Sequence, residues 1–158
     1  MVDVDTLRQT EIFSHLEISQ LKTLQPSCEV RKIEPGQIIF HAGDKADTLY
    51  VLLDGVAVIR FDTDRLEMVM VTFIDPGKSF GWSSLVAPNR YTNTAECPKA
   101  SRVLAVKADG LRELMRHDPG ALFSIMQDII ATLSSRLRDA QVQLYEALEL
   151  IERLGEKK

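Results

Sequence analysis

The sequence is poor in the residues that build several common kinds of site. Among 158 residues there are two cysteines, three histidines and one tryptophan, and 19 basic residues nearly balance 23 acidic ones. Two distant cysteines argue against a disulfide-based scaffold, and the isolated histidines have no spacing typical of a metal-dependent barrel enzyme. The scattered basic residues predict no nucleic-acid partner.

Long apolar runs are missing as well. None approaches the ~20 residues that a membrane-spanning helix needs, and the acidic start of the chain has no secretory-signal character. We therefore expect a cytoplasmic protein with no membrane partner. The sequence also has no nucleophile–base pair and no Walker-type loop, so we predict no catalytic residue, no metal and no cofactor, and hence no enzyme.

Three regions differ in their residue patterns: 1–27, 28–108 and 109–158. In the first, apolar residues at helical spacing predict a short helical lead-in, with Ser19 as the cap of its second helix. They are Leu7, Ile12, Phe13, Leu16, Ile18, Leu21 and Leu24.

The middle region alternates short β-branched and aromatic runs with glycine, proline and aspartate. Asp54-Gly55, between two apolar runs, predicts a tight β-hairpin. Such regular spacing indicates an α+β, mainly β fold built on an antiparallel sandwich or jelly-roll barrel of about eight strands. The predicted strands are Glu29–Ile33, Gln37–His41, Thr48–Leu53, Val56–Phe61, Met68–Ile74, Asn93–Cys97 and Arg102–Val106.

The last region predicts one long helix. Asp118 is a good N-cap with Pro119 at the first helical position, and Gly155 marks the expected end. Apolar or small residues recur alternately four and three apart, which is a coiled-coil seam. Such a seam either packs along its own barrel or pairs with a second copy, and its length favours a homodimer. Its members are Met126, Ile130, Leu133, Leu137, Ala140, Leu144, Ala147, Ile151 and Leu154.

The segment 80–92 has the composition of a phosphate-binding turn. Gly81 suits a tight turn, Ser83 and Ser84 supply hydroxyls in a possible first helical turn, and Arg90 follows. Backbone N–H groups at a helix start attract anions, and an arginine adds two parallel hydrogen bonds to a phosphate. Outside any larger pattern, the simpler interpretation of Arg90 is a surface arginine beside a turn.

In this order the chain resembles the cyclic nucleotide-binding domain family. The resemblance extends from about Phe13 to Leu154 and rests on glycines 36, 43, 55, 77 and 81 around one strand pattern. Its motifs include Pro35-Gly36-Gln37-Ile38-Ile39-Phe40, the run from Leu49 to Val58, Pro76-Gly77 and Phe80-Gly81. It implies a double-stranded β-helix or jelly roll with N-terminal helices, a phosphate-binding cassette and a long C-terminal dimerisation helix.

The resemblance also implies ligand contacts. Gly81, Ser83 and Ser84 match the cassette, and Arg90 with Tyr91 or Thr92 matches the pair that holds the cyclic phosphate. Trp82 stands where the family has a ribose-binding glutamate, and is either a base-stacking platform or a packing residue. On the long helix, Gln141 follows the position where members that bind cyclic AMP offer a hydroxyl, and it is the residue here that can reach a base edge.

Two functions follow from these matches. The first is a regulatory sensor that binds cyclic AMP, cyclic GMP or a related phosphate ligand and transmits the change through a dimeric helix. The alternative is a degenerate domain that binds no cyclic AMP and serves in dimerisation or protein-partner docking. Trp82 favours this alternative because it replaces the glutamate, and Ala140 favours it because the hydroxyl expected on this part of the helix is missing. Only four residues follow Leu154, so we expect no DNA-binding module.

Overall fold

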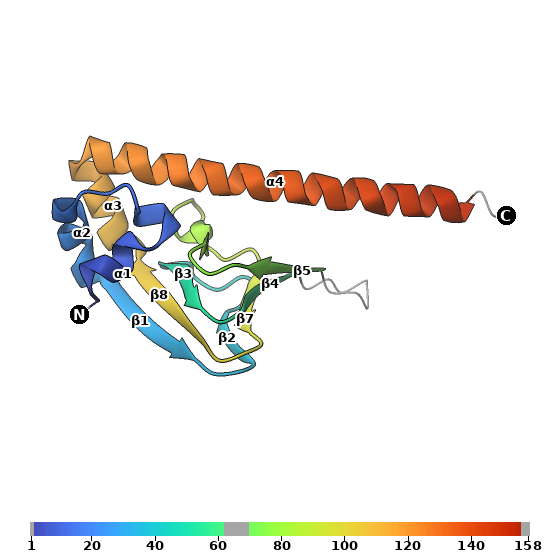
Figure 1. Ribbon diagram of the computed structural model, residues 1–158, viewed down its shortest axis with the longest axis horizontal. Helices are drawn as coiled ribbons and strands as arrows, with labels where there is room; N and C mark the ends of the chain where they lie inside the picture. Colours follow the sequence, from blue (N-terminus) through green and yellow to red (C-terminus); the bar gives the residue numbers. More distant parts are fainter. Residues whose placement is uncertain (1, 62–69, 156–158) are drawn as a thin grey trace. The chain divides into compact units, whose positions relative to one another are not determined.

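The structure is a computed structural model that describes residues 2–61 and 70–155. It divides into two units, Met1–Ser124 and Ile125–Lys158, which are treated separately. Figure 1 shows short helices and α3 packed beside the strands of the first unit. Its helices are α1 (Val4–Arg8), η1 (Glu11–Phe13), α2 (Ile18–Leu24), η2 (Gln25–Ser27), η3 (Trp82–Ser84) and α3 (Ala108–His117).

The described residues form eight strands in two antiparallel four-stranded sheets. The order is β1-β8-β3-β6 in one sheet and β2-β7-β4-β5 in the other, so strands distant in sequence are neighbours. This is a jelly-roll barrel, and the predicted fold class is confirmed. The strands are β1 (Cys28–Ile33), β2 (Gln37–Phe40), β3 (Thr48–Asp54), β4 (Ala57–Phe61), β5 (Met70–Ile74), β6 (Ser79–Phe80), β7 (Thr94–Cys97) and β8 (Ser101–Lys107).

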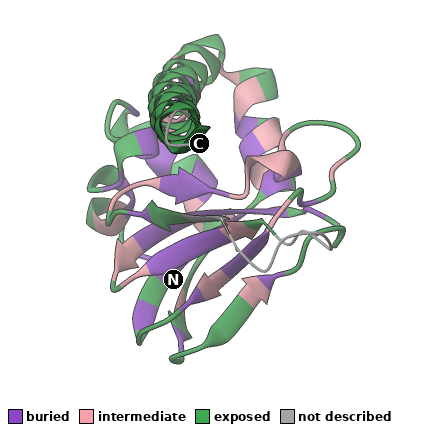
Figure 2. Cartoon of the chain, turned by 90° about the vertical axis from the view of Figure 1, so that its right-hand side faces the viewer, coloured by how far each residue is buried: buried purple, intermediate pink, exposed green. Residues whose placement is uncertain are grey.

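Aromatic rings fill the space between the two sheets. Phe40 stacks on Tyr91 with ring centroids 3.7 Å apart, and Tyr50 stacks on Phe80 at 5.5 Å. Aliphatic side chains from both sheets complete the cluster, which Figure 2 colours purple. Its other buried members are Ile33, Ala46, Leu52, Ala57, Ile59, Ile74, Ala95, Cys97, Val103 and Ala105.

A second apolar layer lies on the outer face of the first sheet. Side chains alternate along a strand, so Leu104 and Val106 of β8 point away from the barrel interior, yet both are fully buried. The helices at this side of the sheet supply the covering residues (Figure 1). Fully buried helical residues are Leu7, Phe13, Leu21, Leu24 and Leu111. The helical lead-in therefore closes the outer face of the sheet.

The predicted hairpin at Asp54-Gly55 is wrong. β3 and β4, on either side of it, belong to different sheets. Gly55 does adopt a left-handed conformation (φ 93°), but the turn bonds to Ser101 instead of closing a ladder: Val56 N–H donates to Ser101 Oγ at 3.0 Å. A Cβ on Gly55 would lie 2.7 Å from the Ser101 Cα. The glycine thus serves a close approach of the turn to the start of β8.

Two helix starts show one wrong and one correct prediction. Ser19 does not cap α2, because the helix begins one residue earlier at Ile18 with Glu17 as N-cap, and Gln20 completes a capping box. Asp118 does cap the long helix, since its Oδ1 accepts from the Ala121 N–H at 2.9 Å. The predicted strand starting at Met68 begins, as far as it is described, at Met70; Met68 lies outside the described residues.

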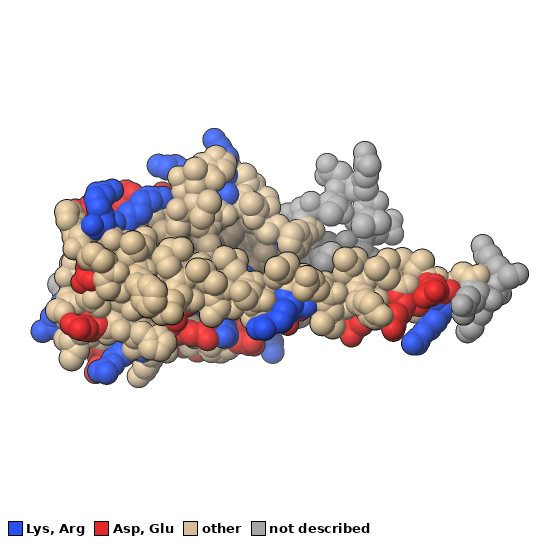
Figure 3. All heavy atoms as spheres, turned by 90° about the horizontal axis from the view of Figure 1, so that it is seen from above, with Lys and Arg blue, Asp and Glu red and all other residues tan. Residues whose placement is uncertain are grey.

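The long helix α4 runs from Pro119 to Gly155. From Ile130 to Leu154 the large apolar side chains of the predicted seam are exposed by 45–65% in the single chain. Charged side chains of its C-terminal part gather along one side of the face seen in Figure 3. No described helix has an apolar stretch sufficient to cross a membrane.

Candidate functional site

The predicted phosphate-binding segment forms a turn, residues 81–92, that follows β6; we call it the cassette turn. Gly81 has φ 81° and precedes the single-turn helix η3. A Cβ on Gly81 would come within 3.4 Å of the Thr48 carbonyl oxygen and of the Tyr50 ring. Glycine is therefore favoured by the left-handed backbone, while a Cβ would meet β3 only at ordinary van der Waals distance.

Asn89 gathers the carbonyl groups of the cassette turn. It adopts a left-handed conformation (φ 55°), which asparagine tolerates better than most residues. Its Nδ2 donates to the carbonyl oxygens of Ser83, Ser84 and Val86 at 3.1–3.2 Å. Asn89 was not among the predicted site residues, although an asparagine directly after a proline is a turn signal.

A second side chain reaches the same carbonyls from α3. One terminal nitrogen of Arg112 donates to the Ser84 carbonyl oxygen. The other donates to Asp109 Oδ1 at 2.7 Å. Arg112 lies 22 residues beyond Arg90 in the chain, and no local motif marks it.

The polar group of Trp82 has a hydrogen-bond partner within the protein. Its indole N–H donates to Ser79 Oγ at 3.0 Å, back toward β6, and its side chain is partly buried. Ser83 is also partly buried, whereas Ser84 is fully buried and its hydroxyl has no hydrogen-bond partner among the described residues. Ser84 thus contributes to the turn mainly through its backbone.

Arg90 is exposed and lies over the neighbouring loop 43–46. Its guanidinium donates to the Gly43 carbonyl oxygen at 2.8 Å. Backbone hydrogen bonds join the same two segments, since Gly43 N–H donates to the Tyr91 carbonyl at 2.7 Å and Ala46 N–H to the Asn89 carbonyl at 2.8 Å. Arg90 therefore has a fixed anchor and a charged group at the surface of the cassette turn.

The remaining predicted site residues lie in three different settings. Tyr91 is buried in the core, where its hydroxyl donates to the Thr48 carbonyl at 2.7 Å and burial raises its pKa. Thr92 is exposed and accepts from the Asn93 amide at 3.2 Å. Gln141 is exposed on α4, within the separate unit that begins at Ile125. The turn therefore holds the predicted residues from Gly81 to Thr92 in one segment, with the Tyr91 side chain in the core and that of Arg90 at the surface.

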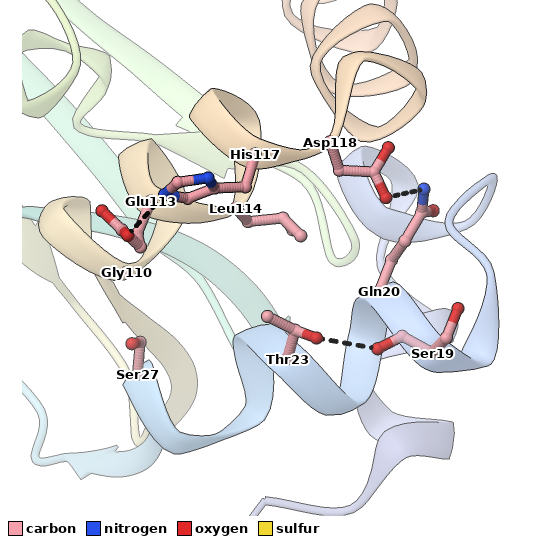
Figure 4. A pocket seen from close by; sticks show the side chains of 9 residues that line it. All are labelled: Ser19, Gln20, Thr23, Ser27, Gly110, Glu113, Leu114, His117 and Asp118. Carbon is pink, nitrogen blue, oxygen red and sulfur yellow. Dashed lines mark hydrogen bonds and ion pairs between the residues drawn. The ribbon is translucent and has the colours of Figure 1, made fainter.

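A separate pocket of about 350 Å³ lies between α2 and α3 (Figure 4). Its carboxylates already have partners within the protein: Asp118 Oδ2 accepts from Gln20 at 2.8 Å, and Glu113 pairs with His117 at 2.9 Å. These contacts explain its polar groups as links between α2, α3 and the start of α4. The cassette turn is accordingly the stronger candidate site.

The cysteines carry no features of a reactive centre. Cys28 and Cys97 are both free, and burial raises the pKa of Cys28 to about 12. A thiol with so high a pKa stays protonated near neutral pH and is a poor nucleophile. Among the described residues, no group of three His, Cys, Asp or Glu side chains is placed to hold a metal ion.

Known proteins share this architecture. The sequence model of the family "Cyclic nucleotide-binding domain" matches residues 30–118, more than half of the chain. The cAMP-activated global transcriptional regulator CRP of Pasteurella multocida is 28% identical over 119 residues, 74% of this chain and 54% of its own length. The chain spans only about half the length of the curated relatives it matches.

Two solved structures illustrate the similarity. A Geobacter metallireducens GS-15 protein, provisionally assigned as cyclic nucleotide-binding, has a TM-score of 0.75 and 29% identity, covering 87% of this chain and 99% of its own. The Thermus thermophilus Catabolite Activator Protein has a TM-score of 0.68 and 22% identity, covering 85% and 62%. At that identity the second likeness supports the fold alone.

Proposed function

The chain belongs to the cyclic nucleotide-binding domain family, and from that premise we propose that it is a regulatory sensor and not an enzyme. In this proposal an anionic ligand of the cyclic nucleotide class binds at the cassette turn of a cytoplasmic protein. Helix α4 joins two copies into a homodimer and transmits the bound state.

The observation that carries the ligand proposal is the arrangement of the cassette turn. η3 starts after a left-handed glycine, and the N–H groups of its first two residues have no acceptor within the helix, whereas that of Ser84 donates to the Gly81 carbonyl at 3.1 Å. Arg90 adds a positive charge at the surface of the same turn, anchored on the Gly43 carbonyl. Both features favour an anion, and an arginine fork suits the two free oxygens of a cyclic phosphate.

Trp82 favours the alternative function of a degenerate docking module. It replaces the carboxylate that the family uses for the ribose hydroxyl, so a charged hydrogen bond worth ~1.5–3 kcal/mol is missing. That difference corresponds to roughly one to two decades in affinity. Cyclic AMP and cyclic GMP are therefore expected to bind weakly, through the phosphate contacts of the cassette turn.

Ligand-dependent thermal stability tests the sensor function. A ligand that binds the folded state raises the melting temperature in proportion to its occupancy. We expect millimolar cyclic AMP, cyclic GMP or cyclic di-GMP to raise it in the wild type and not in Arg90→Gln. Arg102→Gln, which removes an exposed arginine of β8 that pairs with Asp54, is the matched control and should keep the shift.

The opposite result supports the alternative. If none of the three nucleotides changes the melting temperature of the wild type, the sensor function fails for this ligand class. If Arg102→Gln loses the shift as completely as Arg90→Gln, the effect is one of net charge and not of the cassette turn.

The pattern of charges along α4 supports the homodimer. From Leu137 to Leu154 no charged residue occupies a position directly beside the seam; in heptad notation they fall at b, c and f. These residues are Arg138, Asp139, Glu146, Glu149, Glu152 and Arg153. A helix whose apolar stripe is flanked by uncharged residues can pair with its own copy without like-charge repulsion.

A further inference from the structure

The carbonyl group of Ser84 receives hydrogen bonds from two side chains on different elements. Asn89 Nδ2 donates at 3.1 Å from within the cassette turn, and Arg112 donates from α3. Ser84 itself is fully buried. A buried carbonyl needs a hydrogen-bond donor. Ser84 ends a helix of three residues, so side chains supply the donors that the backbone N–H groups of a following helical turn would otherwise supply.

Arg112 is held in an orientation that favours this contact. Asp109, one turn earlier on α3, accepts from its other terminal nitrogen at 2.7 Å. The Asp109 side chain is 98% exposed, whereas that of Arg112 is 33% exposed. Because a guanidinium is planar and its donors are fixed relative to one another, fixing one nitrogen on Asp109 directs the other toward the Ser84 carbonyl.

The two ends of η3 consequently have different surroundings. Its last carbonyls, those of Ser83 and Ser84, are satisfied by Asn89 and Arg112. A positive charge beside the last carbonyls of a helical turn is also favourable electrostatically. Without these donors the carbonyl of the fully buried Ser84 would lack a hydrogen-bond partner in the turn.

We propose that Arg112 is a positioning residue for the cassette turn: it fixes the conformation of residues 81–86 from α3 without contacting the ligand. The proposal deepens the sensor function, because the turn it fixes is the proposed anion site. It assigns the structural role to Arg112 and leaves the ligand contact to Arg90.

Amide hydrogen exchange of the full chain tests this directly. The amides of Ser84 and Leu85 donate to the Gly81 and Trp82 carbonyls at 3.1 and 2.9 Å, so their exchange reports the closed turn. We expect Arg112→Met to speed their exchange by about tenfold or more, as for local opening. Exchange at Leu104 and Val106 of the core strand β8 should stay unchanged.

Three further variants make the result specific. Arg112→Lys keeps one charged donor and should restore part of the protection. Asn89→Gly accepts the positive φ but removes the other donor to Ser84, so it should also speed exchange of the turn. Arg116→Met, which removes an exposed arginine that pairs with Glu113 on the same helix, should behave like the wild type.

Unchanged exchange at Ser84 and Leu85 in Arg112→Met would overturn the proposal, and so would an equal effect of Arg116→Met. Cyclic AMP is then added to separate the role of Arg112 from the ligand proposal. If it protects the turn in the wild type, Arg112→Met should need about tenfold more nucleotide for the same protection. If it protects nothing, the ligand proposal fails, while the exchange without nucleotide still decides the role of Arg112.

Discussion

The indole N–H of Trp82 donates to Ser79 Oγ, so the ring is held back toward β6 by a contact within the protein. A glutamate at the same position would have a shorter side chain and a free carboxylate. The neighbouring residues that shape the turn, Gly81 and Asn89, do not depend on the identity of residue 82 for their hydrogen bonds. The loss of one ligand contact is therefore compatible with an intact cassette turn.

Replacing Trp82 with glutamate should strengthen binding of cyclic AMP. The new carboxylate can accept from the ribose hydroxyl, a charge-assisted bond worth ~1.5–3 kcal/mol, which corresponds to roughly a ten- to hundredfold lower dissociation constant. Isothermal titration calorimetry of Trp82→Glu and wild type with cyclic AMP measures this change.

Trp82→Phe is the control for that experiment. It removes the indole N–H and reduces ring size without adding a carboxylate, so it should leave the affinity close to that of the wild type. Equal gains in Trp82→Phe and Trp82→Glu would mean that space, and not the carboxylate, limits binding. No gain in either variant would favour the docking module.

At the scale of single elements, the turn between β3 and β4 depends on Gly55. Gly55→Ala should destabilise the protein by more than Gly36→Ala, although both positions have positive φ. The left-handed backbone alone is expected to contribute about 1–2 kcal/mol at each. At Gly55 the Cβ also meets the Ser101 backbone, and overpacking typically adds about 1–3 kcal/mol.

Urea denaturation of both variants measures the two free energies of unfolding. Gly36 has open space at the Cβ position, so it isolates the backbone contribution. Equal losses in the two variants would show that Ser101 moves aside and that the close contact of the turn with β8 has little energetic importance.

The start of α4 should give a pH-dependent contribution to stability. The Ala121 N–H, and then the Gln20 amide, hold the pKa of Asp118 below its usual value of 3.8. Because the folded-state pKa is lowered, this contribution is fully present above the pKa of the unfolded state. It is lost as the pH falls through the lower folded-state value.

Thermal unfolding of Asp118→Asn and wild type from neutral to acidic pH checks this expectation. The wild type should have the higher melting temperature at neutral pH, and the difference should shrink below about pH 3.8. Glu17→Gln, at the N-cap of α2, is a control at a different helix start and should not abolish the Asp118 effect. A difference that stays constant with pH would contradict the assigned cause.

These elements show what a sequence can predict and what it cannot. Seven of the strands and the start of α4 follow from periodicity and from capping residues, which act within a few residues of chain. The Asp54-Gly55 turn was assigned to a hairpin because a local signal cannot specify which strands pair; here the partner of Gly55 is Ser101, far along the chain. β6 has two residues, too few for a periodic pattern.

The candidate site, too, depends on contacts between residues that are distant in the sequence. The sequence identified the cassette turn through Gly81 and Arg90, but not the residues that hold its carbonyls. Asn89 was visible only as a turn residue, and Arg112 belongs to α3, so its contact with Ser84 depends on how α3 packs against the barrel. Tyr91 was expected near the ligand, and its ring instead fills the core beside Phe40.

At the scale of the whole molecule, the apolar seam of α4 is exposed in the single chain. Leu137 and Leu144, both on the seam, are exposed by 62% and 60%. Val142 is also apolar and 56% exposed, but it falls at heptad position f, on the opposite side of the helix. The chain therefore offers two matched sites for the same substitution.

Light scattering coupled to size exclusion should find a dimer for the wild type and for Val142→Glu, and a monomer for Leu144→Glu. The reason is that a glutamate at position a lies in the apolar contact between copies, where an unpaired buried charge is strongly unfavourable, whereas one at position f stays in water. A wild-type monomer at every concentration would exclude the homodimer. Equal behaviour of the two variants would place the contact between copies elsewhere than the seam, because only the seam distinguishes these two positions.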